Sequence, residues 1–326
     1  MAPTVAERLF GPRERARLTE LAHIDPEQVL TDFADPAARA VLAETEVLIT
    51  GWQSPLLDVE ALRAAPNLRA VVHAAGSVKG HLAPEVWERG ITVTAAAAGN
   101  ALPVAEFTLA AILFANKRVL PIADAYRAGR TAQDWHARFP EMGNLGKRVG
   151  IVGASRIGRR VIELLRPFDL EIVVSDPYLS AEEARALGVQ ALTLDELCAT
   201  SDVVSLHAPD LPETRHLIDR RRLAHFRDGA TLINTARGAL VDERALVDEI
   251  RAERLYAVLD VTDPWTLPAD SPLYDHPRVL LTPHIAGSLG TELNRLATTA
   301  LDELARYTRG EPFSEQVLAE DLFVIA

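Results

Sequence analysis

Short apolar runs alternate with longer amphipathic stretches between residues 148 and 282, and this alternation restricts the possible folds more than any other feature of the chain. Six runs have the length and composition of buried strands: 148–153, 171–176, 202–207, 230–235, 256–260 and 278–282. Helical stretches such as 157–165 and 243–252 lie between them. Strands that alternate with helices form a parallel sheet covered on both faces, so the sequence predicts an α/β fold with a doubly wound sheet.

A second alternation of strands and helices comes earlier in the chain. Its predicted elements are strands at 46–50, 69–73 and 91–94 and amphipathic helices at 57–65 and 83–89. A long apolar helix from Pro103 to about Gly129 is predicted between the two alternations, and an amphipathic helix is predicted at 291–307. Because 326 residues exceed what one hydrophobic core normally holds, we expect two domains.

Charge and cysteine content exclude several classes of function. The formal net charge is −12, whereas a nucleic-acid or membrane surface would need a basic patch, so neither partner is expected. The single cysteine, Cys198, excludes an internal disulfide, suits a reducing compartment and is expected to fill a core position. The N-terminus lacks the apolar stretch of a secretory signal, and no apolar run approaches the ~18 residues of a membrane span. We therefore expect a cytoplasmic protein, and we assign no metal site.

A glycine-rich turn follows the first strand of the later alternation directly and opens the next helix. Its sequence is Gly153-Ala154-Ser155-Arg156-Ile157-Gly158, the G-x-G-x-x-G pattern with Ser155 in place of the second glycine. In that pattern the first glycine makes the tight turn and the last lets the helix pack closely on the strand. The pyrophosphate of a dinucleotide then binds at the helix N-terminus. The alternative is an ordinary strand-to-helix turn, because the motif alone is a weak signal.

Asp176 strengthens the prediction of a dinucleotide site. It ends the next strand 23 residues after Gly153, where a carboxylate accepts bonds from the ribose hydroxyls and repels a 2′-phosphate. No Arg or Lys occurs at residues 177–179, so NAD is favoured over NADP. As an alternative, Asp176 is a turn-forming residue before Pro177.

Three further segments resemble the active-site segments of a known family. They are Asn234-Thr235-Ala236-Arg237-Gly238, Leu259-Asp260-Val261-Thr262-Asp263-Pro264-Trp265 and Leu281-Thr282-Pro283-His284-Ile285. Together they resemble the D-isomer-specific 2-hydroxyacid dehydrogenases, which combine an Arg, a Glu and a His, and within that family the glyoxylate/hydroxypyruvate reductases. The resemblance is closest from residue 147 to residue 290 and loose before residue 68. Arg237 and His284 match the family's Arg and His, whereas Trp265 stands where the Glu is expected.

This resemblance implies an architecture of two doubly wound parallel-sheet domains. A Rossmann NAD-binding domain at 103–291 would be inserted in a flavodoxin-like substrate domain at 1–102 plus 292–326, although spacing alone also allows two consecutive domains. Family members are commonly homodimers through the cofactor domain, so a homodimer is expected. The chain would interconvert a 2-keto acid and a D-2-hydroxy acid as an NAD-dependent oxidoreductase.

The resemblance and the glycine turn together imply a set of site residues. Arg237 would hold the carboxylate and keto oxygens with its planar fork, and His284 would be the acid/base. The implied cofactor residues are Gly153, Ser155, Arg156, Ile157, Gly158, Asp176, His207, Ala208, Pro209, Thr214, Thr235, Asp260 and Gly287. Asp260 would hold the nicotinamide carboxamide, or it would only cap the turn after Leu259. The implied substrate-binding residues are Gly76, Ser77, Val78 and Asn100.

Trp265 leaves open whether catalysis is abolished, weakened or changed in its substrate. A carboxylate bonded to an imidazole raises its pKa and fixes the ring, whereas an indole offers one donor and no acceptor. We therefore expect a lowered pKa of His284 and weaker reduction at neutral pH, unless Asp263 in the same loop turns toward His284. One alternative function is an NAD(H)-binding sensor or interaction protein with weakened turnover. Another is an enzyme for bulky keto acids, in which Trp265 forms an apolar wall.

Overall fold

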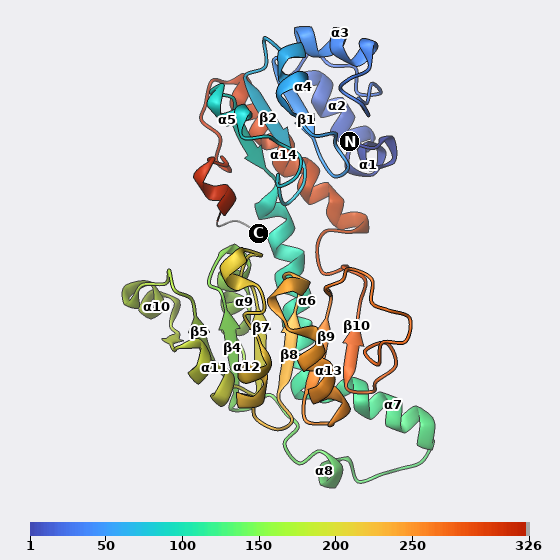
Figure 1. Cartoon of the computed structure of the whole chain (residues 1–326), viewed down its shortest axis with the longest axis vertical. Coiled ribbons are helices and arrows are strands. Elements are labelled where there is room, and N and C mark those ends of the chain that lie inside the picture. The colour runs from blue at the N-terminus through green and yellow to red at the C-terminus, as the bar shows by residue number, and fades with distance from the viewer. Residues whose placement is uncertain (324–326) are drawn as a thin grey trace. The chain divides into compact units, whose positions relative to one another are not determined.

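The computed structural model describes residues 1–323, which divide into two compact units (Figure 1). The first unit contains Met1–Pro103 and the described residues from Gly287 onward, and the second contains Val104–Ala286. The unit boundaries thus fall after residues 103 and 286, whereas the sequence prediction placed them after 102 and 291.

The second unit contains a seven-stranded parallel sheet. Its strands are β4 (Lys147–Val152), β5 (Leu170–Ser175), β6 (Gln190–Ala191), β7 (Val203–Leu206), β8 (Thr231–Asn234), β9 (Tyr256–Leu259) and β10 (Val279–Leu281). They lie in the order β10-β9-β8-β7-β4-β5-β6. The six predicted strands are present, while β6 was not predicted because its two residues are exposed and form no apolar run. The strand order reverses between β4 and β7, and sheets of this kind bind ligands at the carboxyl ends of such strands.

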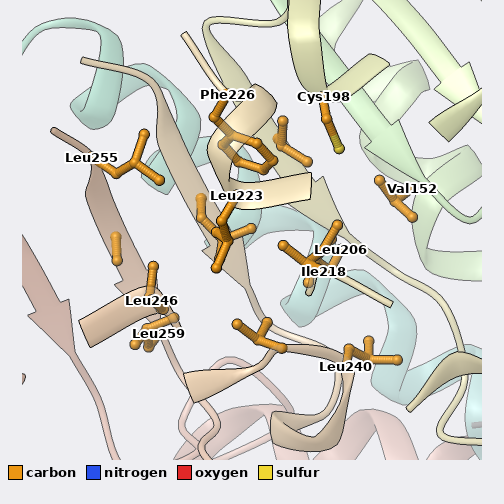
Figure 2. Close-up of a cluster of buried hydrophobic side chains, with 14 of the residues drawn as sticks. Val152, Cys198, Leu206, Ile218, Leu223, Phe226, Leu240, Leu246, Leu255 and Leu259 are labelled. Atoms are coloured by element: carbon orange, nitrogen blue, oxygen red, sulfur yellow. The ribbon is translucent and has the colours of Figure 1, made fainter. Parts of the chain in front are cut away.

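Helices cover both faces of this sheet. They are α6 (Ala97–Asn116), α7 (Val119–Gly129), α8 (Trp135–Arg138), α9 (Arg156–Leu165), α10 (Ala181–Leu187), α11 (Leu194–Thr200), α12 (Arg220–His225) and α13 (Glu243–Arg251), with short 3-10 turns at Pro212–Thr214 and Gly238–Leu240. Because side chains alternate along a strand, Ile151 and its neighbour Val152 belong to different cores. Figure 2 shows the core that contains Val152, in which Leu223 of α12 and Leu246 of α13 are buried. The doubly wound α/β sheet is therefore confirmed.

Cys198 lies in the same core, as predicted. It is fully buried, and burial raises the pKa of its thiol to about 12. A thiol with so high a pKa carries almost no thiolate at neutral pH, so Cys198 acts as a small apolar side chain.

The prediction of one helix from Pro103 to Gly129 is wrong. The structure has two helices, α6 and α7, separated at Arg118, whose φ of 53° lies in the left-handed region. Arg118 is held there by its side chain, which donates to Gly229 O and to Thr231 Oγ1 and lies 4.0 Å from the centre of the Tyr256 ring. The helix breaks because these contacts stabilise a backbone conformation that cannot continue an α-helix.

Helix α6 is long and apolar enough to cross a membrane by length and composition alone. The sequence prediction rested on apolar runs, and polar residues such as Asn100 and Thr108 interrupt them in this helix. Its buried residues Ala105, Ala111 and Ile112 pack in the core beside Ile151, which is the position of a core helix.

The first unit has a smaller parallel sheet in the order β1-β2-β3. The strands are β1 (Val47–Thr50), β2 (Ala70–His73) and β3 (Thr92–Ala95). The helices are α1 (Pro3–Leu9), α2 (Pro12–Leu21), α3 (Pro36–Glu44), α4 (Val59–Ala64), α5 (Glu85–Glu88) and α14 (Leu293–Thr308), with 3-10 turns at Gly290–Glu292 and Glu320–Phe323. Val71 packs in a core with α3, α4 and α5, and Val72 packs in another with α1, α2 and α14. This sheet is also covered on both faces, as predicted.

Candidate active site

The glycine-rich turn connects β4 to α9 and requires glycine at two positions. Gly153 has a φ of +95°, and a Cβ there would come within 2.8 Å of the backbone of His207 and Ala208. A Cβ on Gly158 would come within 2.0 Å of Gly153 O, so the first turn of α9 can approach the strand only without a side chain. The turn therefore has the close backbone packing of a dinucleotide-binding loop.

The first amides of α9 receive no cap from the side chain of the N-cap residue. Ser155 is the N-cap residue, and its side chain caps no amide of the helix but donates to His207 O at 3.3 Å. The first amides of an α-helix have no acceptor within the helix, and their dipoles favour a negative charge. Ser155 and Arg156 are exposed and Ile157 is half-buried. Binding of a pyrophosphate at this turn stays a prediction.

Asp176 lies directly beside the turn. Its Oδ2 accepts a hydrogen bond from Ala154 N at 2.6 Å, and its Oδ1 accepts one from Tyr178 N at 2.7 Å. A carboxylate has about four acceptor positions, so these two bonds leave capacity for ribose hydroxyls. The bond from Tyr178 N is that of a turn-forming Asp, which was the alternative for this residue, whereas the bond from Ala154 N joins the carboxylate to the glycine turn.

The loop after β7 brings the next group of predicted residues to the same place. Ala208 is buried against Gly153, and the side chain of Thr214 closes the loop by donating to Pro209 O at 2.7 Å. His207 is buried, its Nε2 is 2.9 Å from Ser205 Oγ, and burial lowers its pKa to about 3. His207 is therefore neutral near pH 7 and shapes the loop rather than carrying charge.

Arg237 follows β8 in a loop that its own strand holds in place. The side chain of Asn234 donates to Arg237 O at 2.8 Å and accepts from Ala236 N at 3.1 Å. Thr235 is buried, and its hydroxyl is 3.0 Å from that of Thr108 on α6. The guanidinium of Arg237 donates to Ala236 O at 2.7 Å, and burial lowers its pKa while the charge of Asp210 raises it. The rest of its planar fork can hold a carboxylate.

Gly238 brings the Arg237 loop against the loop that follows β9. A Cβ on Gly238 would lie 2.1 Å from the carbonyl carbon of Thr262 and 2.6 Å from Asp263 N. Only a glycine allows this backbone contact, so the segment that carries Arg237 and the segment that carries Trp265 are packed together. The sequence signal was a glycine directly after the Arg, and its structural reason was not predicted.

Asp260 organises the loop that carries His284. The carboxylate is buried and accepts from Thr282 Oγ1 at 2.6 Å, Ile285 N at 2.8 Å and Ala286 N at 2.9 Å, while His284 N donates to Asp260 O at 2.8 Å. His284 has a φ of +56°, which His tolerates better than most residues. These bonds go to the His284 loop and to no cap of the turn after Leu259, the alternative for Asp260 in the sequence.

The imidazole of His284 packs against the indole of Trp265. The ring centres are 4.8 Å apart and the ring planes differ by 40°. Burial lowers the pKa of His284, the nearby charge of Asp260 raises it, and the charge of Arg237 lowers it. The Nδ1 atom is buried and has no hydrogen-bond partner among residues 1–323. The direction of the pKa shift agrees with the expectation for an imidazole without a carboxylate partner.

Asp263 is engaged elsewhere. Its carboxylate forms an ion pair with Arg215 at 3.0 Å, and its backbone N–H bonds to Glu243. Burial raises the pKa of Glu243 to about 6. The prediction that Asp263 could turn toward His284 is thus not what the structure shows, because the charge of Arg215 draws the side chain to its own side.

The residues predicted to bind the substrate carboxylate lie together in the first unit. A Cβ on Gly76 would be 3.1 Å from Asn100 Nδ2, and Asn100 Oδ1 accepts from Ser288 N at 2.9 Å. Gly287, predicted with the cofactor residues, also lies beside Asn100. Ser77 is half-buried and its hydroxyl accepts from Lys79 N, whereas the side chain of Val78 is buried in the core.

Two features of the site were missed by sequence reasoning. The motif that contains Asn234 gave no role for this residue, yet the nitrogen and the oxygen of its side-chain amide both bond the backbone of the Arg237 loop. Arg215 was not considered, because an exposed arginine in a loop gives no signal of its partner. No group of three or more His, Cys, Asp or Glu side chains within residues 1–323 is arranged to hold a metal ion.

A family model matches residues 109–286 of the chain. Its description is "D-isomer specific 2-hydroxyacid dehydrogenase, NAD binding domain". The match contains the glycine turn, Asp176, Arg237, Trp265 and His284, so the whole candidate site of the second unit lies within it.

Curated relatives and solved structures are similar over most of the chain. The D-3-phosphoglycerate dehydrogenase of Mycobacterium tuberculosis is 36% identical over 83% of this chain. The match spans only 51% of the length of that relative. The glyoxylate reductase of Thermofilum pendens is 35% identical, over 78% of this chain and 76% of the relative. The crystal structure of the TT0316 protein from Thermus thermophilus is 33% identical with a TM-score of 0.75, and the match covers 94% of this chain and 96% of that one.

Proposed function

Because the chain belongs to the D-isomer-specific 2-hydroxyacid dehydrogenase family, we propose that it is an NAD-dependent oxidoreductase that interconverts a 2-keto acid and a D-2-hydroxy acid. The observation that carries the proposal is the grouping of Arg237 and His284. They follow β8 and β10 of one parallel sheet, and Arg237 is close enough for its charge to lower the pKa of His284. A fixed cation and a titratable imidazole are the two groups that reduction of a keto acid needs beside a hydride source.

The residues divide the work as follows. Arg237 holds the carboxylate and polarises the keto oxygen, because its fork makes two parallel bonds. His284, in its protonated form, donates the proton that the C2 oxygen needs as the carbonyl is reduced, and in the reverse direction it takes that proton back. Asp260 holds the His284 loop. The bound nicotinamide supplies the hydride. Gly76, Ser77, Val78 and Asn100 remain the proposed residues for the substrate carboxylate.

The pH dependence follows from the direction of the His284 pKa. Reduction needs the imidazolium, which is present below the pKa and is lost as the pH rises through it. Burial lowers this pKa from its ordinary value of about 6.5, so reduction is expected to be faster at mildly acidic than at neutral pH. Oxidation of the hydroxy acid should show the opposite dependence.

The proposed cofactor is NAD rather than NADP. Asp176 is held beside the glycine turn, where its charge repels a 2′-phosphate, and the exposed residue Tyr178 follows it. Asp176→Asn keeps an acceptor for Ala154 N and removes the charge. A hydrogen bond to a charged group contributes about 1 kcal/mol or more of free energy beyond a bond to a neutral group. The preference for NADH over NADPH should therefore fall on the order of tenfold.

Binding of both cofactors, followed by nucleotide fluorescence, measures this preference. Asp275→Asn, an exposed carboxylate of the same unit, is the control and should change nothing. An unaltered preference in Asp176→Asn would remove the reason for assigning NAD.

The proposed substrate class is a small 2-keto acid of the glyoxylate/hydroxypyruvate type. The proposal is supported by the names of two relatives of comparable length, both glyoxylate reductases, from Thermofilum pendens and Korarchaeum cryptofilum. NADH consumption across small, branched and aromatic keto acids tests it, and the small acids should have the higher kcat/KM. Faster reduction of aromatic or branched acids would instead favour Trp265 as the wall of a larger side-chain pocket.

One observation favours a second candidate function, an NAD(H)-binding sensor with weakened turnover. His284 has no carboxylate partner at Nδ1 among the described residues, and Asp263 is paired with Arg215. Binding of NADH without consumption by any keto acid of the panel would establish this second function in place of the first.

We also propose that the second unit forms a homodimer. Its helix α7 has no buried residue. Phe114 on α6 is 53% exposed and lies beside an apolar pocket lined by Phe107, Leu120 and Pro121. A second copy of the chain would cover this apolar surface. Light scattering should give twice the mass of 35.5 kDa, and a monomeric mass at micromolar concentration would contradict the proposal. We propose separately that the protein is cytoplasmic, because its single cysteine suits a reducing compartment.

A further inference from the structure

The position of Trp265 is not explained by core packing. The side chain is 71% exposed, yet one part of its indole contacts the imidazole of His284, with ring centres 4.8 Å apart. A large aromatic side chain gains little free energy from burial when most of it stays in solvent. Burial therefore contributes little at this position, where the indole makes its ring contact with His284.

The loop that carries Trp265 is fixed at several points. Thr262 Oγ1 lies 2.8 Å from Pro264 O and 3.2 Å from Trp265 O, so its hydroxyl ties the two carbonyls together. Asp263 forms its ion pair with Arg215, and the backbone at Thr262 lies against Gly238. Trp265 is thus presented to His284 by an anchored segment, and the ring contact does not depend on a free loop.

The groups around His284 on balance disfavour its charged form. Of the charged groups that face it, Asp260 favours the imidazolium and Arg237 disfavours it, while burial also disfavours it. Asp263 forms an ion pair with Arg215, and Nδ1 has no partner within the described chain. The electron-rich face of an indole attracts a cation that lies within about 6 Å of the ring centre, and this attraction exists only when the imidazole is protonated.

We propose that Trp265 is a positioning residue that holds the His284 ring and favours its charged form through this ring contact. The inference deepens the proposed function, because it matters to catalysis only if His284 is the acid. Trp265 then takes over, more weakly, the two tasks of a carboxylate at this position, which are to orient the imidazole and to stabilise its proton. A neutral partner at 4.8 Å cannot match the attraction of a carboxylate.

The test is the titration of His284 by NMR in protein labelled in its histidines, with the resonance assigned by its loss in His284→Asn. Trp265→Leu removes the aromatic face and keeps an apolar side chain, so the pKa of His284 should fall by about half a unit. Trp265→Phe restores an aromatic face and should recover at least half of that shift. Exposed His225 at the end of α12 serves as an internal reference whose signal should be the same in all variants.

The kinetic readout is the limb of the kcat profile on which reduction is lost as the pH rises. In Trp265→Leu this limb should move to lower pH by the same half unit, while KM for NADH stays the same. Equal His284 titrations in wild type and Trp265→Leu overturn the inference, as does a Phe variant that titrates like the Leu variant. A shifted titration in a protein that reduces no keto acid supports the inference and refutes the proposed function. Turnover with an unshifted titration does the reverse.

Discussion

The His284→Asn variant should reduce 2-keto acids about 10²- to 10⁴-fold more slowly than the wild type, because it lacks the group that donates the proton to the C2 oxygen. Asn is the substitution to choose, since His284 has a φ of +56° and Asn adopts the left-handed region as readily as His does. The measurement is kcat at a saturating concentration of NADH, together with NADH binding by fluorescence, which should remain within a factor of about two.

The matched control is His225→Asn. His225 is exposed at the end of α12, outside the segments that carry the site residues, so this variant should keep full activity. If His284→Asn retained most of the wild-type kcat, proton donation would have to come from another group. The assignment of His284 would then be wrong even if the enzyme is a dehydrogenase.

The Arg237→Lys variant should lose about 10²- to 10³-fold in kcat/KM although the positive charge is kept. A lysine offers a point charge and cannot hold the carboxylate and the keto oxygen with two parallel bonds. Removal of one well-placed donor to a developing oxyanion typically costs a factor of this size. Initial rates over a range of keto acid concentrations measure the loss, which should appear in both kcat and KM.

Arg244→Lys is the control for this substitution, because Arg244 is exposed on α13. The His284 titration gives a second readout, since Arg237 lowers the pKa of His284 through its charge and Lys keeps that charge. A Lys variant with unchanged kcat/KM would show that charge alone suffices at this position and that the planar fork is not used.

The fold could be predicted from the sequence because its signals are local. The strands of the large sheet are short apolar runs bounded by polar residues, and all six were placed within one residue of their ends. The elements that were predicted wrongly lack such a local signal. The break at Arg118 depends on a side chain that reaches Gly229 and Thr231, more than a hundred residues away, and β6 is too short and too exposed to show a pattern.

The same division applies to the site. Gly153, Gly158 and Asp176 follow a strand–turn–helix pattern, so their packing could be foreseen. The partners of Asp260 and Asp263 could not be foreseen, because the donors that bond each carboxylate come near it only when the loops are folded. Asp260 bonds the His284 loop and Asp263 pairs with Arg215. That choice leaves Trp265 as the neighbour of His284.

The most direct test of the account follows the hydride itself. NADH carrying deuterium at both C4 positions is supplied with the most rapidly reduced keto acid that gives a chiral product. We predict that one deuterium appears at C2 of a D-2-hydroxy acid. In the His284→Asn variant the same transfer should be much slower. An unlabelled or L-configured product, or bound NADH that is never consumed, would contradict the claim that this chain is a D-2-hydroxyacid dehydrogenase.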